Sequence, residues 1–143
     1  MLMIDADWFK AFNDSQRHAA GDTSLRRIGA VLANRSPVGS AVVRLGGEGF
    51  AVLTRLPDPF AASLLAEDLR GAVAALAIPH PRAPGSCLTV SIGVAVAQGD
   101  DSDVLMAAAD MALYAAENDG RNCVRAADPA AATATANASA TGT

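Results

Sequence analysis

Apolar and polar positions follow two different periods along the chain, and the changes between them mark predicted strands and helices. Continuous apolar residues at Met1–Asp5 predict a short buried strand that ends on an acid. Alternation over residues 88–97 predicts a strand with its large aliphatic residues on one face. The apolar runs 41–45 and 50–54 flank a turn with three glycines at 46–49, which predicts a hairpin whose turn is free to adopt positive φ angles.

Three segments instead show the spacing of helices. Leu25, Ile28 and Leu32 share one face of a predicted helix over 19–34. A helix is predicted over 58–75, because apolar residues at helical spacing form one stripe that we expect to be buried. These residues are Phe60, Leu64, Leu69, Val73 and Leu76. A third helix is predicted over 102–118, before Asp119-Gly120, and residues 122–125 are interpreted as a last edge strand. This order predicts an α+β fold of the ferredoxin-like kind, an antiparallel sheet covered by helices.

Composition narrows the class of protein. The 143 residues suffice for one domain with a single core, and 51% of them are hydrophobic. The net charge is −4 without a cluster of Lys and Arg, so we expect no nucleic-acid partner. Cys87 and Cys123 form neither a disulfide framework nor a metal-ligand pattern, which indicates a reducing compartment. No apolar run approaches the ~18 residues that span a bilayer, and no signal peptide is visible, so we expect a cytoplasmic location without a membrane segment.

The two ends of the sequence differ from its middle. From Ala126 onward the chain consists largely of Ala, Thr, Asn, Ser and Gly without periodicity. This composition predicts a folded domain over 1–125 and a disordered low-complexity tail over 126–143. Because the chain starts inside its first predicted strand, we expect the fold to be truncated at its N-terminus.

Acidic residues stand at two predicted strand ends. Asp5 ends the first strand, and Glu48 lies at the hairpin tip. Mg²⁺ prefers hard oxygen ligands and keeps phosphates as further ligands, so these two carboxylates and a strand-end carbonyl such as that of Ala6 are candidate ligands. Taken singly, Asp5 is as readily a solvated strand-end acid and Glu48 an ordinary turn acid.

Several sequence blocks occur together in one order. They are Asp5-x-Asp7-x-Phe9-Lys10-x-x-Asn13-Asp14, Gly21-Asp22-x-x-Leu25, Gly46-Gly47-Glu48-Gly49-Phe50, Leu88-Thr-Val-Ser-Ile-Gly-Val94, and Ala109-Asp-Met-Ala-Leu-Tyr114 with Gly120-Arg121-Asn122. Over residues 1–125 this set resembles the GGDEF family, the diguanylate cyclases that join two GTP molecules into cyclic di-GMP.

The resemblance implies a role for each matched residue. The implied Mg²⁺ ligands are the side chains of Asp5 and Glu48 and the carbonyl of Ala6. Glu48 would also help to deprotonate the ribose 3′-hydroxyl. The implied GTP contacts are those of Phe9 and Lys10 with the triphosphate, of Asn13 and Asp22 with the guanine edge, and of Arg121 with a phosphate. The signature turn consists of Gly46, Gly47, Gly49 and Phe50 around Glu48.

Without the resemblance, several of these residues have simpler interpretations. Asp22 is then a helix N-cap, and Asn13 is a turn residue. The sequence also leaves open whether Trp8 is exposed or lines the edge of a pocket.

The chain departs from the family pattern at four places. Gly49 stands where the family has a glutamate, and Glu117 stands where it has a lysine that faces the phosphates. Arg17 replaces a glycine before His18. Residues 37–40 read Pro-Val-Gly-Ser where the family often has an Arg-x-x-Asp inhibitory site, so we expect no product feedback there.

Three hypotheses about function follow. The first is a diguanylate cyclase impaired at Gly49 and Glu117, working as a homodimer or as a heterodimer with another GGDEF domain. The second is a catalytically silent GTP-binding or protein-interaction domain that regulates a partner output domain or pairs with an intact cyclase. Sensor or output domains attached in a longer protein are possible partners in either case. The third, outside the family, is a plain ferredoxin-like interaction module that binds no nucleotide.

Overall fold

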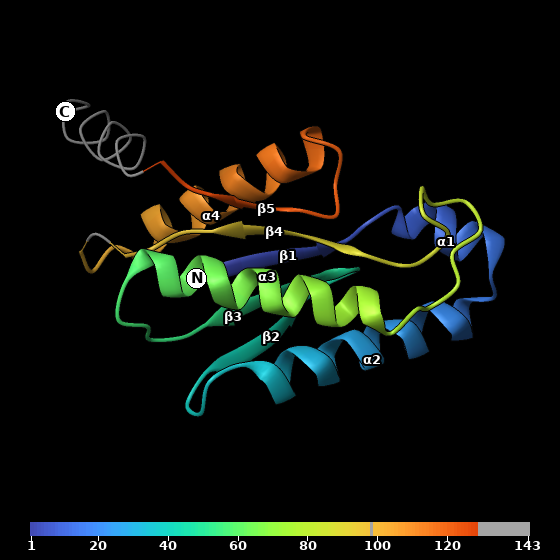
Figure 1. Ribbon diagram of the computed structural model, residues 1–143, viewed down its shortest axis with the longest axis horizontal. Helices are drawn as coiled ribbons and strands as arrows, with labels where there is room; N and C mark the ends of the chain where they lie inside the picture. The colour runs from blue at the N-terminus through green and yellow to red at the C-terminus, as the bar shows by residue number, and fades with distance from the viewer. Residues whose placement is uncertain (98, 129–143) are drawn as a thin grey trace.

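A five-stranded sheet with helices on both faces forms the body of the molecule, as a computed structural model shows for residues 1–97 and 99–128 (Figure 1). The strands are β1 (Leu2–Ala6), β2 (Ala41–Leu45), β3 (Gly49–Leu53), β4 (Val90–Val94) and β5 (Val124–Ala126). Their order is β2-β3-β1-β4-β5, and every neighbouring pair is antiparallel except β4 and β5. The predicted α+β fold is confirmed. The parallel last pair arises because the chain crosses over through a helix between these two strands.

Helices cover the two faces of the sheet unequally. They are α1 (Phe9–Ser15), α2 (His18–Arg35), α3 (Pro59–Ala75) and α4 (Ser102–Asn118). Both α2 and α3 pack on one face and α4 on the other (Figure 1). The carboxylates of Asp58 and Asp101 cap α3 and α4, accepting hydrogen bonds from backbone N–H groups of the first turn. The short helix α1 was not predicted, because its two buried aromatic residues, Phe9 and Phe12, define too short a pattern.

Alternation along β1 decides where its acid points. Leu2 and Ile4 belong to the large core between the sheet and α2 and α3. Met3 belongs to the smaller core beneath α4. Since side chains alternate between the faces of a sheet, Asp5 lies on the α4 side, at the end of the strand. There it is paired in register with Gly49 of β3 and with Ser91 of β4.

Two details of the predicted packing are wrong. Leu69 and Val73 of the predicted stripe are buried, but Phe60 and Leu64 are 72% and 55% exposed, and Ala62 and Ala66 complete the buried face of α3 in their place. Small alanines let this helix approach the sheet closely, which turns the larger residues outward. Strand β4 spans only residues 90–94 and is buried on both faces, because α3 and α4 cover it from opposite sides.

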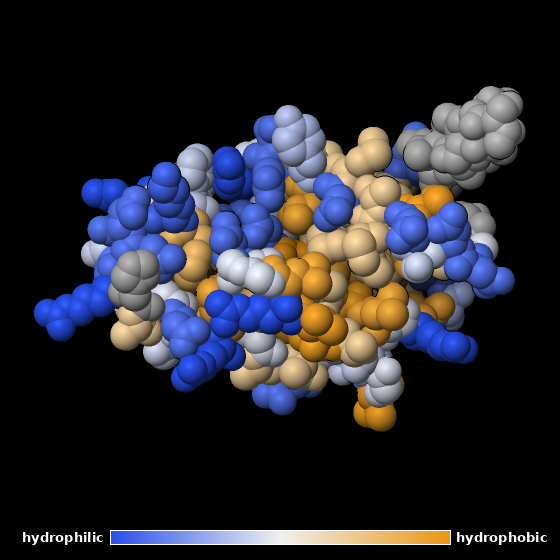
Figure 2. Space-filling model, turned by 180° about the vertical axis from the view of Figure 1, so that it is seen from behind, coloured by the Kyte–Doolittle hydropathy of each residue, from blue (hydrophilic) through white to orange (hydrophobic). Residues whose placement is uncertain are grey.

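Part of the sheet face beside α4 carries exposed apolar side chains. Val43, Leu45 and Leu53 of the hairpin are 49%, 43% and 50% exposed. Figure 2 shows apolar side chains gathered on the side of the molecule opposite to the view of Figure 1. No helix in residues 1–97 and 99–128 is long and apolar enough to cross a membrane. Strand β5 extends to Ala126, and the predicted tail beyond residue 128 lies outside the described residues.

Candidate functional site

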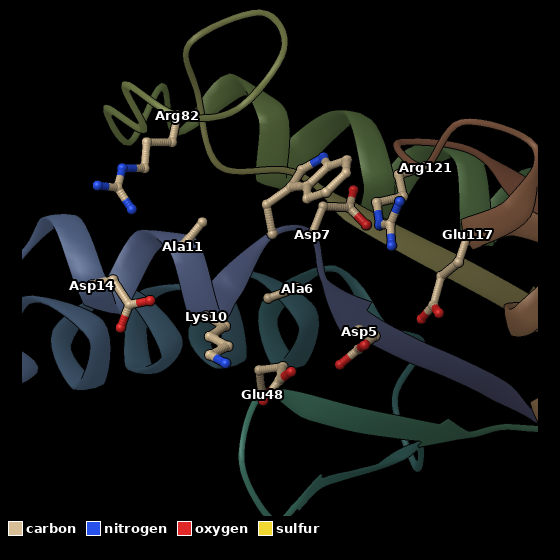
Figure 3. Close-up of a pocket in the computed structure, with 11 residues that line it drawn as sticks. Asp5, Ala6, Asp7, Lys10, Ala11, Asp14, Glu48, Arg82, Glu117 and Arg121 are labelled. Carbon is tan, nitrogen blue, oxygen red and sulfur yellow. The ribbon is translucent and has the colours of Figure 1, made fainter.

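A cavity of about 400 Å³ opens at the end of β1 where the chain turns into α1 (Figure 3). Five acidic residues, from β1, α1, α4 and two turns, line it: Asp5, Asp7, Asp14, Glu48 and Glu117. Three cationic residues also line it: Lys10, Arg82 and Arg121. The cavity therefore combines carboxylates with cations, as a site for a metal ion and phosphates requires.

Backbone hydrogen bonds hold the end of β1 between the hairpin tip and β4. The Ala6 N–H donates to the Glu48 carbonyl over 3.2 Å, and the Asp7 N–H donates to the Thr89 carbonyl over 2.9 Å. The first bond fixes Glu48 beside the strand that carries Asp5. Two carboxylates that are 43 positions apart in sequence, at residues 5 and 48, thus lie at one cavity (Figure 3).

Negative charge at this cavity is only weakly compensated. The pKa of Asp5 is raised from 3.8 to about 7, first by burial and then by the nearby carboxylates of Glu48, Glu117 and Asp7. In the part of the chain that the structure describes, Asp5, Glu48 and Glu117 have no lysine or arginine nitrogen within 4.0 Å. A bound cation would relieve this repulsion, so the carboxylates fit a divalent metal ion electrostatically.

The protein side chains alone do not enclose a metal ion. Among the described residues, no group of three or more His, Cys, Asp or Glu side chains could hold a metal. Mg²⁺ is commonly bound by one or two carboxylates, with phosphates and water completing its octahedron. Asp5, Glu48 and the Ala6 carbonyl match that smaller set of ligands.

Asp7 has a structural role that the sequence did not reveal. It is 3% exposed, and its carboxylate accepts hydrogen bonds from the Thr89 hydroxyl (2.7 Å), the Ser91 hydroxyl (2.6 Å) and the Asn122 N–H (3.0 Å). These bonds join β1 to β4 and to the loop that carries Arg121. One part of this arrangement could be seen in the sequence, because Thr89 and Ser91 are polar residues of an alternating strand. The sequence did not show that they meet Asp7.

Two arginines at the cavity, Arg121 and Arg82, are placed there by a ring contact and by a loop, respectively. The guanidinium carbon of Arg121 lies 4.0 Å from the ring centroid of Trp8, which is 42% exposed. Trp8 therefore both reaches solvent and lines the cavity, which the sequence left open. Arg82 comes from the irregular loop after α3, which the Pro79–Cys87 bridge closes. No motif marked Arg82, so sequence reasoning missed it.

Five of the predicted site residues line the cavity: Asp5, Ala6, Lys10, Glu48 and Arg121. The signature-turn residues Gly46, Gly47, Gly49 and Phe50 do not line it, and neither do three residues that the resemblance implies to bind GTP. Phe9 is buried, and its ring stacks on that of Phe12 with centroids 5.7 Å apart. The Asn13 side chain lies against Gly21, which precedes Asp22 in sequence, and neither Asn13 nor Asp22 lines this cavity.

The alternative interpretations of Asn13 and Asp22 are both wrong. Asp22 lies inside α2, not at its N-cap, and its carboxylate pairs with Arg26 at 2.9 Å and with Arg44 at 3.5 Å. Asn13 lies in α1, not in a turn, and its buried Oδ1 has no hydrogen-bond partner in the described structure. An unpaired buried oxygen is unusual in a folded protein.

Comparison with known proteins decides the family. The sequence matches the family described as "Diguanylate cyclase, GGDEF domain" over residues 1–123. The chain belongs to the GGDEF family. Its relatives include the diguanylate cyclase DgcM of Escherichia coli strain K12, which is 43% identical over 129 residues covering 89% of this chain. Diguanylate cyclase A of Treponema denticola is 34% identical over 126 residues, 87% of this chain.

Solved GGDEF domains have the same fold. The GGDEF domain of DgcB from Caulobacter crescentus, crystallised with c-di-GMP, superposes with a TM-score of 0.78 at 30% identity, covering 87% of this chain and 75% of that one. The active GGEEF domain of a diguanylate cyclase from Vibrio cholerae superposes with a TM-score of 0.74 at 27% identity, covering 89% and 81%. The chain spans only 30% and 34% of the two curated relatives, so it corresponds to one domain of each.

Proposed function

We propose that this GGDEF domain binds GTP and Mg²⁺ at the cavity beside β1 and carries out the diguanylate cyclase reaction with reduced turnover. In that reaction, two GTP molecules give cyclic di-GMP and two pyrophosphates. The observation that carries the proposal is the convergence of Asp5 and Glu48 on one cavity that Lys10 and Arg121 also line. Two such domains, in a homodimer or with another GGDEF domain, would each present one GTP to the other.

Each residue has a proposed task at the bound nucleotide. Asp5, Glu48 and the Ala6 carbonyl would hold Mg²⁺, which supplies charge neutralisation at the phosphates and acidifies the attacking hydroxyl. Glu48 would accept the proton of the ribose 3′-hydroxyl. Lys10 and Arg121 would bind the triphosphate with their cationic groups, and the backbone N–H of Phe9 would add a donor.

Guanine recognition is proposed for Asn13 and Asp22. The unpaired Oδ1 of Asn13 supports this, since a guanine N–H would satisfy it. The carboxylate of Asp22 would exchange Arg26 and Arg44 for the N1–H and the amino group of guanine. Both ion pairs are solvent-exposed, and such pairs contribute only ~0.2–1 kcal/mol, so the exchange costs little.

Reduced turnover is proposed from two residues. The Vibrio cholerae domain described as active has the signature GGEEF, whereas this chain has Gly49 at the position of the second glutamate. Glu117 adds a negative charge that faces Asp5, at a place where triphosphate oxygens would approach. Loss of one group that stabilises charge at an active site commonly costs ~2.7–4 kcal/mol of transition-state stabilisation.

A catalytically silent regulatory domain is the second candidate, and the charge of Glu117 favours it. In that role the domain would bind GTP or a protein partner without turnover. A related Pseudomonas aeruginosa diguanylate cyclase, SiaD, is known in complex with its activator SiaC, so relatives do assemble with protein partners. The free thiols of Cys87 and Cys123 and the use of GTP fit a cytoplasmic location.

A turnover assay tests the proposal. The purified chain at high concentration is incubated with GTP and Mg²⁺, and cyclic di-GMP is measured against a Glu48→Ala control. We expect a low rate above that control and a large increase in the Gly49→Glu variant. A Cβ at Gly49 would meet the Leu45 carbonyl oxygen at 3.2 Å, so the variant requires a small shift of the hairpin backbone. Absence of product from both folded proteins would refute the cyclase and leave the regulatory candidate.

A further inference from the structure

The side chain of Arg121 is held by an aromatic ring and not by a carboxylate. Its guanidinium carbon lies 4.0 Å from the centroid of the Trp8 ring. Within residues 1–97 and 99–128, no Asp or Glu oxygen lies within 4.0 Å of this guanidinium, although Glu117 lines the same cavity. A cation over the face of an indole is attracted by the quadrupole of the ring. Trp8 is therefore the described side chain that orients Arg121.

This arrangement leaves the hydrogen-bond donors of Arg121 available. A guanidinium is planar, and its N–H groups point outward in the plane of the group. In residues 1–97 and 99–128, no hydrogen bond from the Arg121 guanidinium is present, so its fork of donors remains free for a phosphate. A carboxylate partner would have occupied the same donors. The geometry is therefore suited to presenting a cation to an anionic ligand.

The backbone at both ends of the contact is fixed by buried groups. Trp8 has a φ of 56°, in the left-handed region, and its carbonyl accepts hydrogen bonds from the Phe12 N–H and from Nε2 of the fully buried His80, each over 2.9 Å. Arg121 and Asn122 are also left-handed, with φ of 62° and 47°. The buried Asp7 carboxylate accepts from the Asn122 N–H. Strained conformations of this kind persist only where surrounding contacts hold them.

We propose that Trp8 is a positioning residue that presents the guanidinium of Arg121 to the phosphates of a ligand in the cavity. Arg121 thereby supplies a cationic contact in the cavity that Glu117 also lines, where Glu117 stands in place of the family's lysine. This inference rests on the proposed function for the identity of the ligand, the triphosphate of GTP. The central claim is that Trp8 controls phosphate binding through Arg121, and inorganic pyrophosphate alone is enough to test it.

Trp8 fluorescence provides the first test, because the chain contains a single tryptophan. Emission is recorded for the parent chain, for Arg121→Ala and for Arg27→Ala, which removes one exposed arginine outside the cavity. We expect Arg121→Ala to change the emission, and Arg27→Ala to leave it unchanged. Titration of magnesium pyrophosphate should change the emission of the parent and of Arg27→Ala only. Equal spectra and equal responses in all three proteins would overturn the inference.

Calorimetry with the same ligand provides the second test. Trp8→Asn removes the ring and keeps a residue that tolerates the left-handed region, so the fold should be retained. We expect it to bind magnesium pyrophosphate roughly 3- to 10-fold more weakly, and Trp8→Phe to lose less. If Trp8 had a purely structural role, urea unfolding would show a lower stability of Trp8→Asn, but the affinity for magnesium pyrophosphate would not decrease in the order parent, Trp8→Phe, Trp8→Asn. Affinity of Trp8→Asn within 1.5-fold of the parent would overturn the inference.

The outcomes separate this inference from the proposed function. If the parent binds GTP and Trp8→Asn binds it equally well, the positioning role fails and the proposed function stands. If the parent binds pyrophosphate in a Trp8-dependent manner but shows no preference for GTP over ATP, the positioning role stands and the proposed function fails. If the parent binds neither ligand, both are refuted.

Discussion

Replacing Glu117 by lysine should change how the stability of this domain depends on pH. Glu117 contributes to the raised pKa of Asp5, which is about 7 in the folded chain against 3.8 as the ordinary value. The folded state therefore binds more protons than the unfolded state between pH 3.8 and 7, and the free energy of unfolding falls as pH rises through this window. Above pH 7 the cost of ionising Asp5 is fully present.

The size of the effect follows from the same pKa. The difference between 3.8 and about 7 corresponds to at most ~4 kcal/mol at ~1.36 kcal/mol per pH unit. Because Asp5 is only half-buried, solvent screening reduces this cost to about 1–2 kcal/mol. Two like charges about 5 Å apart repel by about 0.8 kcal/mol in water and by about 3 kcal/mol at an effective dielectric of 20. Glu117→Lys replaces such a repulsion by an attraction and should recover about 1 kcal/mol at pH 8.

Urea unfolding between pH 4 and pH 8 measures the prediction, with Glu117→Gln as a control of similar shape. We expect the parent to lose stability toward pH 8, Glu117→Gln to lose less, and Glu117→Lys to lose least. Asp5→Asn should remove most of the dependence in the parent. Parallel pH curves for the parent and both Glu117 variants would refute the view that Glu117 raises the pKa of Asp5.

Three further predictions concern packing and the buried polar groups; the first two are checked by urea unfolding and the third by nucleotide binding. Asp7→Asn should lower stability by ~2–3 kcal/mol, because an amide cannot accept all three hydrogen bonds of the buried carboxylate; an unchanged midpoint would contradict this. Gly93→Ala should cost more than ~3 kcal/mol because its Cβ would overlap the backbone of α4, whereas Gly71→Ala, which meets nothing within 4 Å, should add ~0.5–1 kcal/mol. Gly21→Ala would displace the Asn13 side chain and should lower the preference for GTP over ATP in binding assays, an effect that Gly71→Ala should not show.

The sequence predicted the strands and long helices within one to three residues at most ends, because periodicity of apolar residues is a local property. The sequence failed to predict which side chains are buried where this depends on the neighbouring elements that cover a helix or strand. Phe60 and Leu64 fit a helical stripe, yet α3 turns them outward and buries Ala62 and Ala66. Likewise, the alternation around β4 could not reveal that a helix covers each face.

At the site, the sequence predicted the two facing acids and two of the three cations at the cavity. The sequence placed Asp5 at a strand end and Glu48 at a hairpin tip, and it was the family resemblance that paired them and assigned Lys10 and Arg121 to the phosphates. Arg82 could not be found, since an irregular loop brings it to the cavity without any periodic signal. Asp7 was overlooked because its partners, Thr89 and Ser91, lie more than 80 residues away in sequence.

The resemblance implied that Glu117 faces the phosphates, but the sequence alone could not show that it also raises the pKa of Asp5. Glu117 is separated from Asp5 by 112 positions (117 minus 5), and only the crossing of α4 over the end of β1 makes it a neighbour. At the cavity, the negative charge of Glu117 attracts a bound Mg²⁺ and repels the phosphates of a bound triphosphate. Glu117 should therefore weaken nucleotide binding more than metal binding. A lower affinity for GTP alongside a retained affinity for Mg²⁺, relative to Glu117→Gln, is the signature of this residue.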